Sequence, residues 1–166
     1  MKKTFILIFT FSINLIYPKE IQVNLLELYK ELHANPELSY QEFETSKKLA
    51  SVLESIGYQV TRNVGGNGVV ALLENGDGNT VMFRADMDGL PVEEKTGASY
   101  ASKNRVKNLD GEEVFTMHAC GHDVHMTVLI GVAEYLYKIK DTSQGKHLIE
   151  HEPAEEDIGD ARHMIK

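Results

Sequence analysis

The chain has 166 residues, of which 42% are hydrophobic and 25% are charged, and its formal net charge is −8 at pH 7. These proportions are typical of a soluble globular protein and argue against a disordered or fibrous chain. The acidic balance argues against a nucleic-acid partner, because nucleic-acid-binding domains usually present a basic face. The sequence has 1 cysteine, which excludes a disulfide within the chain.

The first 19 residues differ in composition from the rest. Lys2 and Lys3 precede an apolar run over residues 5–17. Cations ahead of a short apolar stretch are typical of a secretory signal peptide, and the run is shorter than the roughly 20 residues that span a membrane. We therefore expect residues 1–19 to direct export to the periplasm or outside the cell. Membrane contact through this segment is expected only if it stays uncleaved, and a buried N-terminal helix or strand is the alternative.

Two amphipathic helices are predicted after the leader. Apolar residues at helical spacing predict a helix over residues 23–32, which ends before Pro36. A second helix is predicted with Ser39 as its candidate N-cap and Gly57 at its end, and its apolar positions are Phe43, Leu49, Ala50, Leu53 and Ile56.

The remaining chain alternates between strand and helix patterns. Glycine pairs and an Asn-Gly pair mark turns between the first strands. The predicted elements are strands over residues 58–64, 69–73 and 80–83, a helix over 123–139, a weak strand over 147–151 and a helical segment over 158–165. This interleaving predicts an α/β domain with a mixed or parallel sheet over residues 20–166.

Three histidines, a cysteine and an aspartate lie together just before the long apolar helix. They fall between Met117 and His125, around the sequence Cys120-Gly121-His122. A thiolate and an imidazole two residues apart can bind one transition-metal ion if the chain turns at the glycine. A bound metal would keep the thiol ionised at neutral pH. The alternative is a buried cysteine beside surface histidines.

Two acidic segments follow predicted strands. Glu155 and Glu156 follow the last strand, where adjacent carboxylates can divide two roles, one binding a metal and the other accepting a proton from water. Asp86 and Asp88 follow the third strand and could orient a metal-binding histidine from behind. The alternatives are a solvated helix N-terminus and an ordinary Asp-Gly turn.

Four motifs resemble, in their order, those of the M20 family of metal-dependent peptidases and amidohydrolases. The branch is that of hippurate hydrolases, N-acyl-amino-acid amidohydrolases and plant auxin-conjugate hydrolases. The motifs are Leu32-His33-Ala34-Asn35-Pro36-Glu37-Leu38-Ser39 with Glu42 and Thr45, Phe83-Arg84-Ala85-Asp86-Met87-Asp88-Gly89-Leu90-Pro91, His118-Ala119-Cys120-Gly121-His122-Asp123 with His125, and Pro153-Ala154-Glu155-Glu156. The resemblance implies the N-terminal part of a three-layer α/β catalytic domain of the zinc-peptidase type, without the lid or dimerisation domain.

The resemblance also implies roles for the matching residues. Cys120, His122 and Glu156 would bind the metal. The catalytic candidates are Glu155, as general base, and Asp88, which would support the metal site from behind. The cofactor would be Mn²⁺ or Zn²⁺, with two ions in a complete family member. The implied reaction is hydrolysis of the amide bond of an N-acyl amino acid, a small-molecule substrate. We expect the metal ligands and Glu155 to converge at one edge of the sheet.

Family members are more than twice as long as this chain. The resemblance implies a second histidine ligand soon after the Glu-Glu motif and a last one near the C-terminus, besides the lid. We therefore expect a truncated or partial form that is inactive by itself, with a homodimer only at full length. The competing hypothesis is a non-catalytic remnant that at most binds a metal ion or a partner. The polar sequence Glu150-His151-Glu152 is expected to weaken the strand before the motif.

Overall fold

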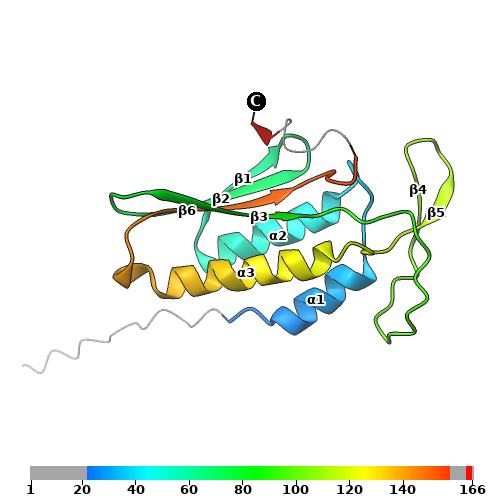
Figure 1. The fold of residues 1–166 in the computed structure, drawn as a ribbon, viewed down its shortest axis with the longest axis horizontal. Coiled ribbons are helices and arrows are strands. Elements are labelled where there is room, and N and C mark those ends of the chain that lie inside the picture. Colours follow the sequence, from blue (N-terminus) through cyan, green and yellow to red (C-terminus); the bar gives the residue numbers. More distant parts are fainter. Residues whose placement is uncertain (1–21, 158–163, 166) are drawn as a thin grey trace, which may run out of the picture.

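The computed structural model describes residues 22–157 and 164–165. These residues form a four-stranded sheet with helices packed against one face, and a separate two-stranded hairpin (Figure 1). Of the three layers expected, the described residues therefore supply the sheet and one helical layer. The predicted signal segment, residues 1–19, and most of the predicted C-terminal helical segment lie outside the described ranges. Within those ranges, no helix has the length and apolar character needed to cross a membrane.

The three long helices lie close to where their sequence patterns predict them. They are α1 (Leu25–Ala34), α2 (Phe43–Ile56) and α3 (His122–Lys138). The side chain of Asn24 accepts a hydrogen bond from the Glu27 N–H at 3.2 Å and so caps the first turn of α1. Gly57 ends α2 with φ 118°, a left-handed conformation that glycine adopts without steric cost. The predicted stop at Gly57 is confirmed.

The predicted N-cap at Ser39 is wrong. The carboxylate of Glu37 accepts the backbone N–H of Glu44 at 3.2 Å and of Thr45 at 2.8 Å, whereas the Ser39 hydroxyl donates to Asp88. Tyr40 has φ 65°, so the chain turns sharply before α2 begins. The longer side chain of Glu37 is therefore the one that reaches the free N–H groups of the first turn.

The sheet is mixed, and its parallel pair brings two strand ends together. Its strands are β1 (Gln59–Val64), β2 (Gly68–Asn75), β3 (Thr80–Asp86) and β6 (Gly145–Glu152), in the order β1-β2-β6-β3. Both β1–β2 and β2–β6 are antiparallel, and β3 runs parallel to β6 with Asp86 opposite Glu152. The hairpin of β4 (Arg105–Lys107) and β5 (Glu113–Phe115) was not predicted from the sequence.

The polar residues near the end of β6 do not interrupt its pairing. Pairing with β3 continues to Glu152, whose side chain is fully buried and lies 2.6 Å from Arg84 Nη1. His151 is also fully buried, and burial lowers its pKa to about 3, so the ring is neutral near neutral pH. One polar residue is thus paired with a charge and the other is uncharged, which lets β6 remain a central strand.

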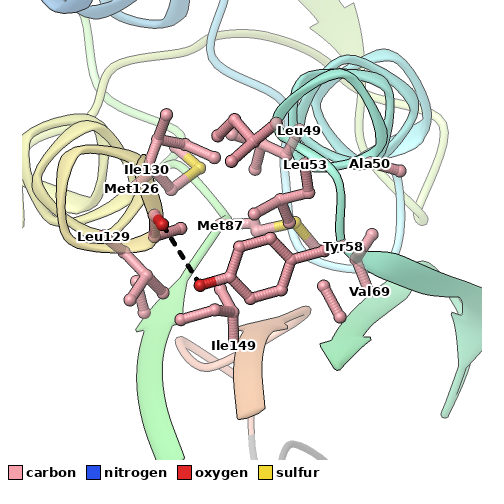
Figure 2. Close-up of a cluster of buried hydrophobic side chains, with 14 of the residues drawn as sticks. Leu49, Ala50, Leu53, Tyr58, Val69, Met87, Met126, Leu129, Ile130 and Ile149 are labelled. Atoms are coloured by element: carbon pink, nitrogen blue, oxygen red, sulfur yellow. Dashed lines mark hydrogen bonds between the residues drawn. The ribbon is translucent and has the colours of Figure 1, made fainter. Parts of the chain in front are cut away.

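The hydrophobic core fills the space between the sheet and helices α2 and α3 (Figure 2). Burial of an aliphatic side chain contributes roughly 1.5–3 kcal/mol, so this layer supplies most of the apolar stabilisation. The Tyr58 hydroxyl crosses the layer and donates to the carbonyl of Ala133 at 3.1 Å. The labelled core residues with no exposed surface include Leu49 and Leu53 of α2, Met126 and Ile130 of α3, Val69 and Ile149 of the sheet, and Met87 after β3.

Candidate metal centre

The ends of β3 and β6 place the two acidic motifs side by side. The Met87 N–H donates to the Glu152 carbonyl at 2.9 Å, which extends the pairing just past both strands. Met87 itself is fully buried in the core. Met87 therefore fixes the backbone between Asp86 and Asp88, through its hydrogen bond to Glu152 and its burial in the core.

His122 is the first residue of α3 and lies between the two acidic motifs. It follows Gly121, whose φ of 83° provides the predicted turn at the glycine. His122 Nδ1 donates to the Asp88 carbonyl at 2.8 Å, because a carbonyl oxygen can only accept. Nε2 lies 3.7 Å from Glu155 Oε2 and 4.0 Å from Glu156 Oε1. The carboxylate of Asp88, 3.4 Å from Nδ1, raises the pKa of His122 to about 9.

Asp88 links several segments behind His122. Its Oδ2 accepts the Ser39 hydroxyl at 2.6 Å and the Glu156 N–H at 3.0 Å. Burial raises the pKa of Asp88, but the hydrogen bonds from His122 and Ser39 outweigh burial and leave that pKa lowered. Asp88 is 1% exposed, so it is a buried carboxylate that stays ionised because neighbouring donors surround it. Its place behind His122 is the one that the sequence predicts for a supporting carboxylate.

Cys120 lies beside Glu156 at the open side of the site. A hydrogen bond to Glu156, together with nearby negative charges, raises the pKa of the Cys120 thiol to about 11. The thiol is therefore protonated at neutral pH unless a cation offsets these charges. Cys120 is exposed, whereas His118 and His122 are each 4% exposed. The alternative of a buried cysteine beside surface histidines is thus wrong for Cys120, His118 and His122, and His125 is the one histidine of the segment that is exposed.

The donor set fits a divalent cation. Asp86, His122 and Glu155 each offer one ligand atom, and these atoms lie within 4.8 Å of one another. Within the part of the chain that the structure describes, the buried Oδ1 atoms have only long polar contacts: that of Asp86 lies 3.5 Å from Arg84 Nη2 and that of Asp88 lies 3.4 Å from His122 Nδ1. Burial raises the pKa of Glu155, and the charges of Asp86 and Glu156 add to that rise. A cation among these carboxylates would offset their mutual repulsion, and imidazole, thiolate and carboxylate are all zinc ligands.

Of the predicted ligands, only His122 belongs to the group of close ligand atoms, in which Asp86 and Glu155 join it and Cys120 and Glu156 do not. The sequence predicts Cys120, His122 and Glu156 as ligands and Glu155 as base. All four converge with Asp88 at one edge of the sheet, as the contacts of His122 and Cys120 show. Asp86 joins them because the parallel pairing of β3 with β6 brings it opposite Glu152. In the sequence, the spacing Asp-x-Asp after a predicted strand was the signal that could have identified Asp86 as a candidate ligand.

The first motif contributes contacts to which the sequence assigned no role. His33 Nδ1 lies 2.6 Å from Asp123 Oδ2, next to His122, and Nε2 lies 3.0 Å from Glu94 Oε1. The side chains of Glu94 and Asp123 are 0% and 3% exposed. Helix α1 is thereby joined to the start of α3 through a buried histidine between two carboxylates.

An open cavity of about 230 Å³ reaches Glu156 from the side of the first motif. Its lining combines apolar side chains with the acidic edge of the site. The apolar residues are Leu38, Leu90, Pro91 and Leu109. A small molecule in this cavity would lie beside the carboxylates described above.

Comparison with known proteins gives consistent matches. The peptidase family M20/M25/M40 matches residues 82–166. Thermostable carboxypeptidase 2 of Saccharolobus solfataricus is 43% identical over 152 residues, which cover 89% of this chain and 36% of the relative. The hippurate hydrolase of Campylobacter jejuni is 38% identical over 148 residues, covering 89% of this chain and 36% of the relative. The chain thus spans little more than a third of the length of these relatives.

A solved structure confirms the predicted fold class. The crystal structure of the Bacillus subtilis YXEP protein, a dinuclear metal-binding peptidase from the M20 family, matches with a TM-score of 0.75 and 36% identity. The match covers 85% of this chain and 37% of that protein. The described residues therefore adopt the α/β fold of part of such a peptidase.

Proposed function

The chain belongs to the M20/M25/M40 peptidase family, and on that basis we propose that it carries part of a metal-dependent site that hydrolyses the amide bond of N-acyl amino acids. The observation that carries the proposal is the convergence of Cys120, His122, Glu155 and Glu156 around Asp88. These residues come from three separate segments, so local sequence composition alone does not explain their meeting. The names of the relatives, including a hippurate hydrolase, support the substrate class.

The proposed ligands are Cys120, His122 and Glu156, with Asp86 near enough to take part. Because Nδ1 of His122 donates to Asp88, Nε2 is the ring nitrogen that faces Glu155 and Glu156, and an ion bound there would displace the proton that the raised pKa of His122 keeps on the ring at neutral pH. The ion would be Mn²⁺ or Zn²⁺, or a pair of ions. When bound, it would polarise the amide carbonyl and increase the acidity of water.

Glu155 is proposed as the general acid and base. Its raised pKa suits a carboxylate that accepts a proton from the attacking water and returns it to the leaving amine. Glu156 is held next to it by the hydrogen bond from its N–H to Asp88. The cavity of about 230 Å³ beside Glu156 would receive the bulk of the substrate.

We further propose that the 166-residue chain alone binds Zn²⁺ or Mn²⁺ weakly and hydrolyses N-acyl amino acids at no detectable rate. The family resemblance implies two more histidine ligands and lid residues that orient the substrate, and none of these is assigned among the described residues. Loss of orientation alone can reduce a rate by about five powers of ten or more. Robust, chelator-sensitive hydrolysis by this chain would contradict this part of the proposal and leave the family assignment unchanged.

A chimera tests the proposed function directly. The segment of the C. jejuni hippurate hydrolase that aligns with this chain would be replaced by residues 20–166, and hippurate hydrolysis and metal content would be measured. We expect Glu155→Gln to reduce turnover by about 10²-fold or more while the metal stays bound. Cys120→Ala should lose metal. The exposed Glu112→Gln is the matched control and should change neither. Full turnover in the Glu155→Gln chimera would contradict the assignment of the base.

Export is a separate proposal. We propose that residues 1–19 direct the chain out of the cytoplasm, because two lysines precede a short apolar run. Fusing these residues to a reporter that functions only outside the cytoplasm should give signal. Replacing Lys2 and Lys3 by Glu should lower it. Retention of the fusion in the cytoplasm would contradict the proposal.

A further inference from the structure

Glu42 is a fully buried carboxylate whose hydrogen bonds reach the segment of the proposed base. Its Oε1 accepts the backbone N–H of Ala154 at 2.7 Å, from a residue 112 positions away in sequence. Its Oε2 accepts Nδ2 of Asn67 at 2.9 Å. Glu42 is 0% exposed, and no cation pairs with it among the residues that the structure describes. Burial of a carboxylate is unfavourable unless hydrogen-bond donors satisfy its oxygens.

Ala154 has an unfavoured, left-handed backbone conformation. Its φ is 57°, in the left-handed region that residues with a Cβ rarely adopt, and it is 1% exposed. It lies between Pro153 and Glu155, at the point where the chain leaves β6 and turns. The Asp157 N–H donates back to the Ala154 carbonyl at 3.3 Å, which closes that turn. An unfavoured conformation next to a proposed base persists only if its surroundings hold it.

We propose that Glu42 is a positioning residue of this site: by accepting the Ala154 N–H, its buried carboxylate holds the left-handed turn that places Glu155 and Glu156 beside His122. The hydrogen bond from the Glu156 N–H to Asp88 fixes the far side of the same turn. Glu42 is thus the contact that holds the near side. The role of Glu155 and Glu156 in this inference rests on the proposed hydrolytic site. The hydrogen bond by which Glu42 stabilises the turn at Ala154 is independent of that function.

The neighbouring Glu37 provides a matched control. Both glutamates lie in the segment before α2, and both accept backbone N–H groups. The side chain of Glu37 accepts from Glu44 and Thr45 in the first turn of α2, and its backbone carbonyl, which the substitution leaves in place, accepts from Gly89. Glu37→Gln should therefore affect the helix and not the turn at Ala154. A general effect of removing charge near α2 should therefore be seen in Glu37→Gln as well.

Amide hydrogen exchange in the metal-free 166-residue chain tests the hold on Ala154. In Glu42→Ala the Ala154 amide should exchange about tenfold faster, which corresponds to the loss of one hydrogen bond, while Leu49 and Leu53 in α2 keep their protection. Glu42→Gln should restore most of the protection, because its side-chain carbonyl can still accept and Asn67 can turn its amide to match. If Glu42→Ala does not fold, Asn67→Ala takes its place and should loosen Ala154 by a smaller factor. Unchanged Ala154 exchange in the folded variants would overturn the proposal.

Binding of Co²⁺ alone tests the consequence for the site. The Co²⁺–thiolate absorption of Cys120 would be titrated in the wild-type chain and in the Glu42 and Glu37 variants. We expect Glu42→Ala to weaken Co²⁺ binding about tenfold and Glu37→Gln to leave it unchanged. Equal binding by wild type and Glu42→Ala would overturn the positioning role. Absence of the band in the wild type would instead count against the proposed metal site, while the exchange result would still decide whether Glu42 holds Ala154.

Discussion

The core and the metal-binding edge of this domain are stabilised by different interactions. Between the sheet and helices α2 and α3, side chains such as Leu53 and Ile130 are in apolar contact without directional partners (Figure 2). At the ends of β3 and β6, buried carboxylates such as Asp88 and Glu42 accept hydrogen bonds from distant segments. The core depends on apolar area and volume, whereas the edge depends on which atoms donate to which.

This difference predicts two kinds of response to substitution. A smaller side chain in the core leaves a cavity, and the loss of stability scales with its size. Loss of one partner at the edge leaves a buried charge without compensation, so the loss depends on chemistry and on pH. Met87 belongs to both regions, because it is buried in the core between Asp86 and Asp88. Packing thus sets where the edge lies, and hydrogen bonds set its geometry.

The largest expected effect is in the core. Leu53 has no exposed surface, so Leu53→Ala should lower the free energy of unfolding by about 2–5 kcal/mol, measured by urea denaturation. Val128 lies on α3 and is 58% exposed, so Val128→Ala is the control and should change stability by less than about 0.5 kcal/mol. Similar losses in the two variants would argue against the described core.

A slightly smaller effect, with a pH signature, is expected at His33. His33→Leu leaves Asp123 and Glu94 buried without their shared partner and should cost about 2–3 kcal/mol near pH 6. Burial lowers the pKa of His33, but the hydrogen bonds to Glu94 and Asp123 outweigh burial and raise it. The stabilisation by protonated His33 is therefore full below the unfolded pKa of 6.5 and is lost as pH rises through the folded pKa.

The measurement at His33 is the stability difference between wild type and His33→Leu across this pH range. The difference should be larger at pH 6 than at pH 9. A difference that grows with pH would show that the ring is not held in its charged form.

His151 is a polar exception on the core side of β6, two residues from Ile149. Its ring nitrogens make no hydrogen bond within the described chain, so His151→Phe should raise the free energy of unfolding by about 1 kcal/mol at pH 7. Burial lowers the pKa of His151 to about 3, below the ordinary histidine value of 6.5. The wild type should therefore lose on the order of 1 kcal/mol per pH unit as pH falls below 6.5, and His151→Phe should lose less. Identical acid dependence of the two proteins would contradict this assignment.

The smallest effect is expected at Ala154. Glycine removes the left-handed penalty but increases the freedom of the unfolded chain, so Ala154→Gly should stabilise the fold by no more than about 1 kcal/mol. Thermal unfolding would measure the change. A clear loss of stability would mean that the turn is not strained.

Much of the core layer could be predicted from the sequence, because its helices have regular apolar spacing. The predicted second helix has its apolar positions and its end at Gly57 in common with α2, although the cap at Ser39 placed its start too early, and the prediction of 123–139 differs from α3 by one residue at each end. The short strands β4 and β5 were missed, because three residues are too few to establish the alternation that predicts a strand. The Ser39 cap was wrong because the chain turns at Tyr40 and brings Glu37 to the helix instead.

The candidate site could be predicted only where its residues are adjacent in sequence. The Cys120-Gly121-His122 spacing and the Glu155–Glu156 pair indicate a metal site before any fold is known. The contacts of His33 with Asp123 and of Glu42 with Ala154 join residues 90 and 112 positions apart. No periodicity or local composition encodes such pairs, because they depend on how α1, α3 and β6 pack.

A shared metal site can be tested by titrating the 166-residue chain with Co²⁺ and following the thiolate-to-metal absorption. We expect a weak, chelator-reversible absorption band that disappears in Cys120→Ala and is strongly reduced in His122→Ala and Glu156→Gln. The exposed Glu112→Gln should leave the band unchanged. A band of equal strength in Cys120→Ala, or none in the wild type, would contradict the claim that these residues bind one ion.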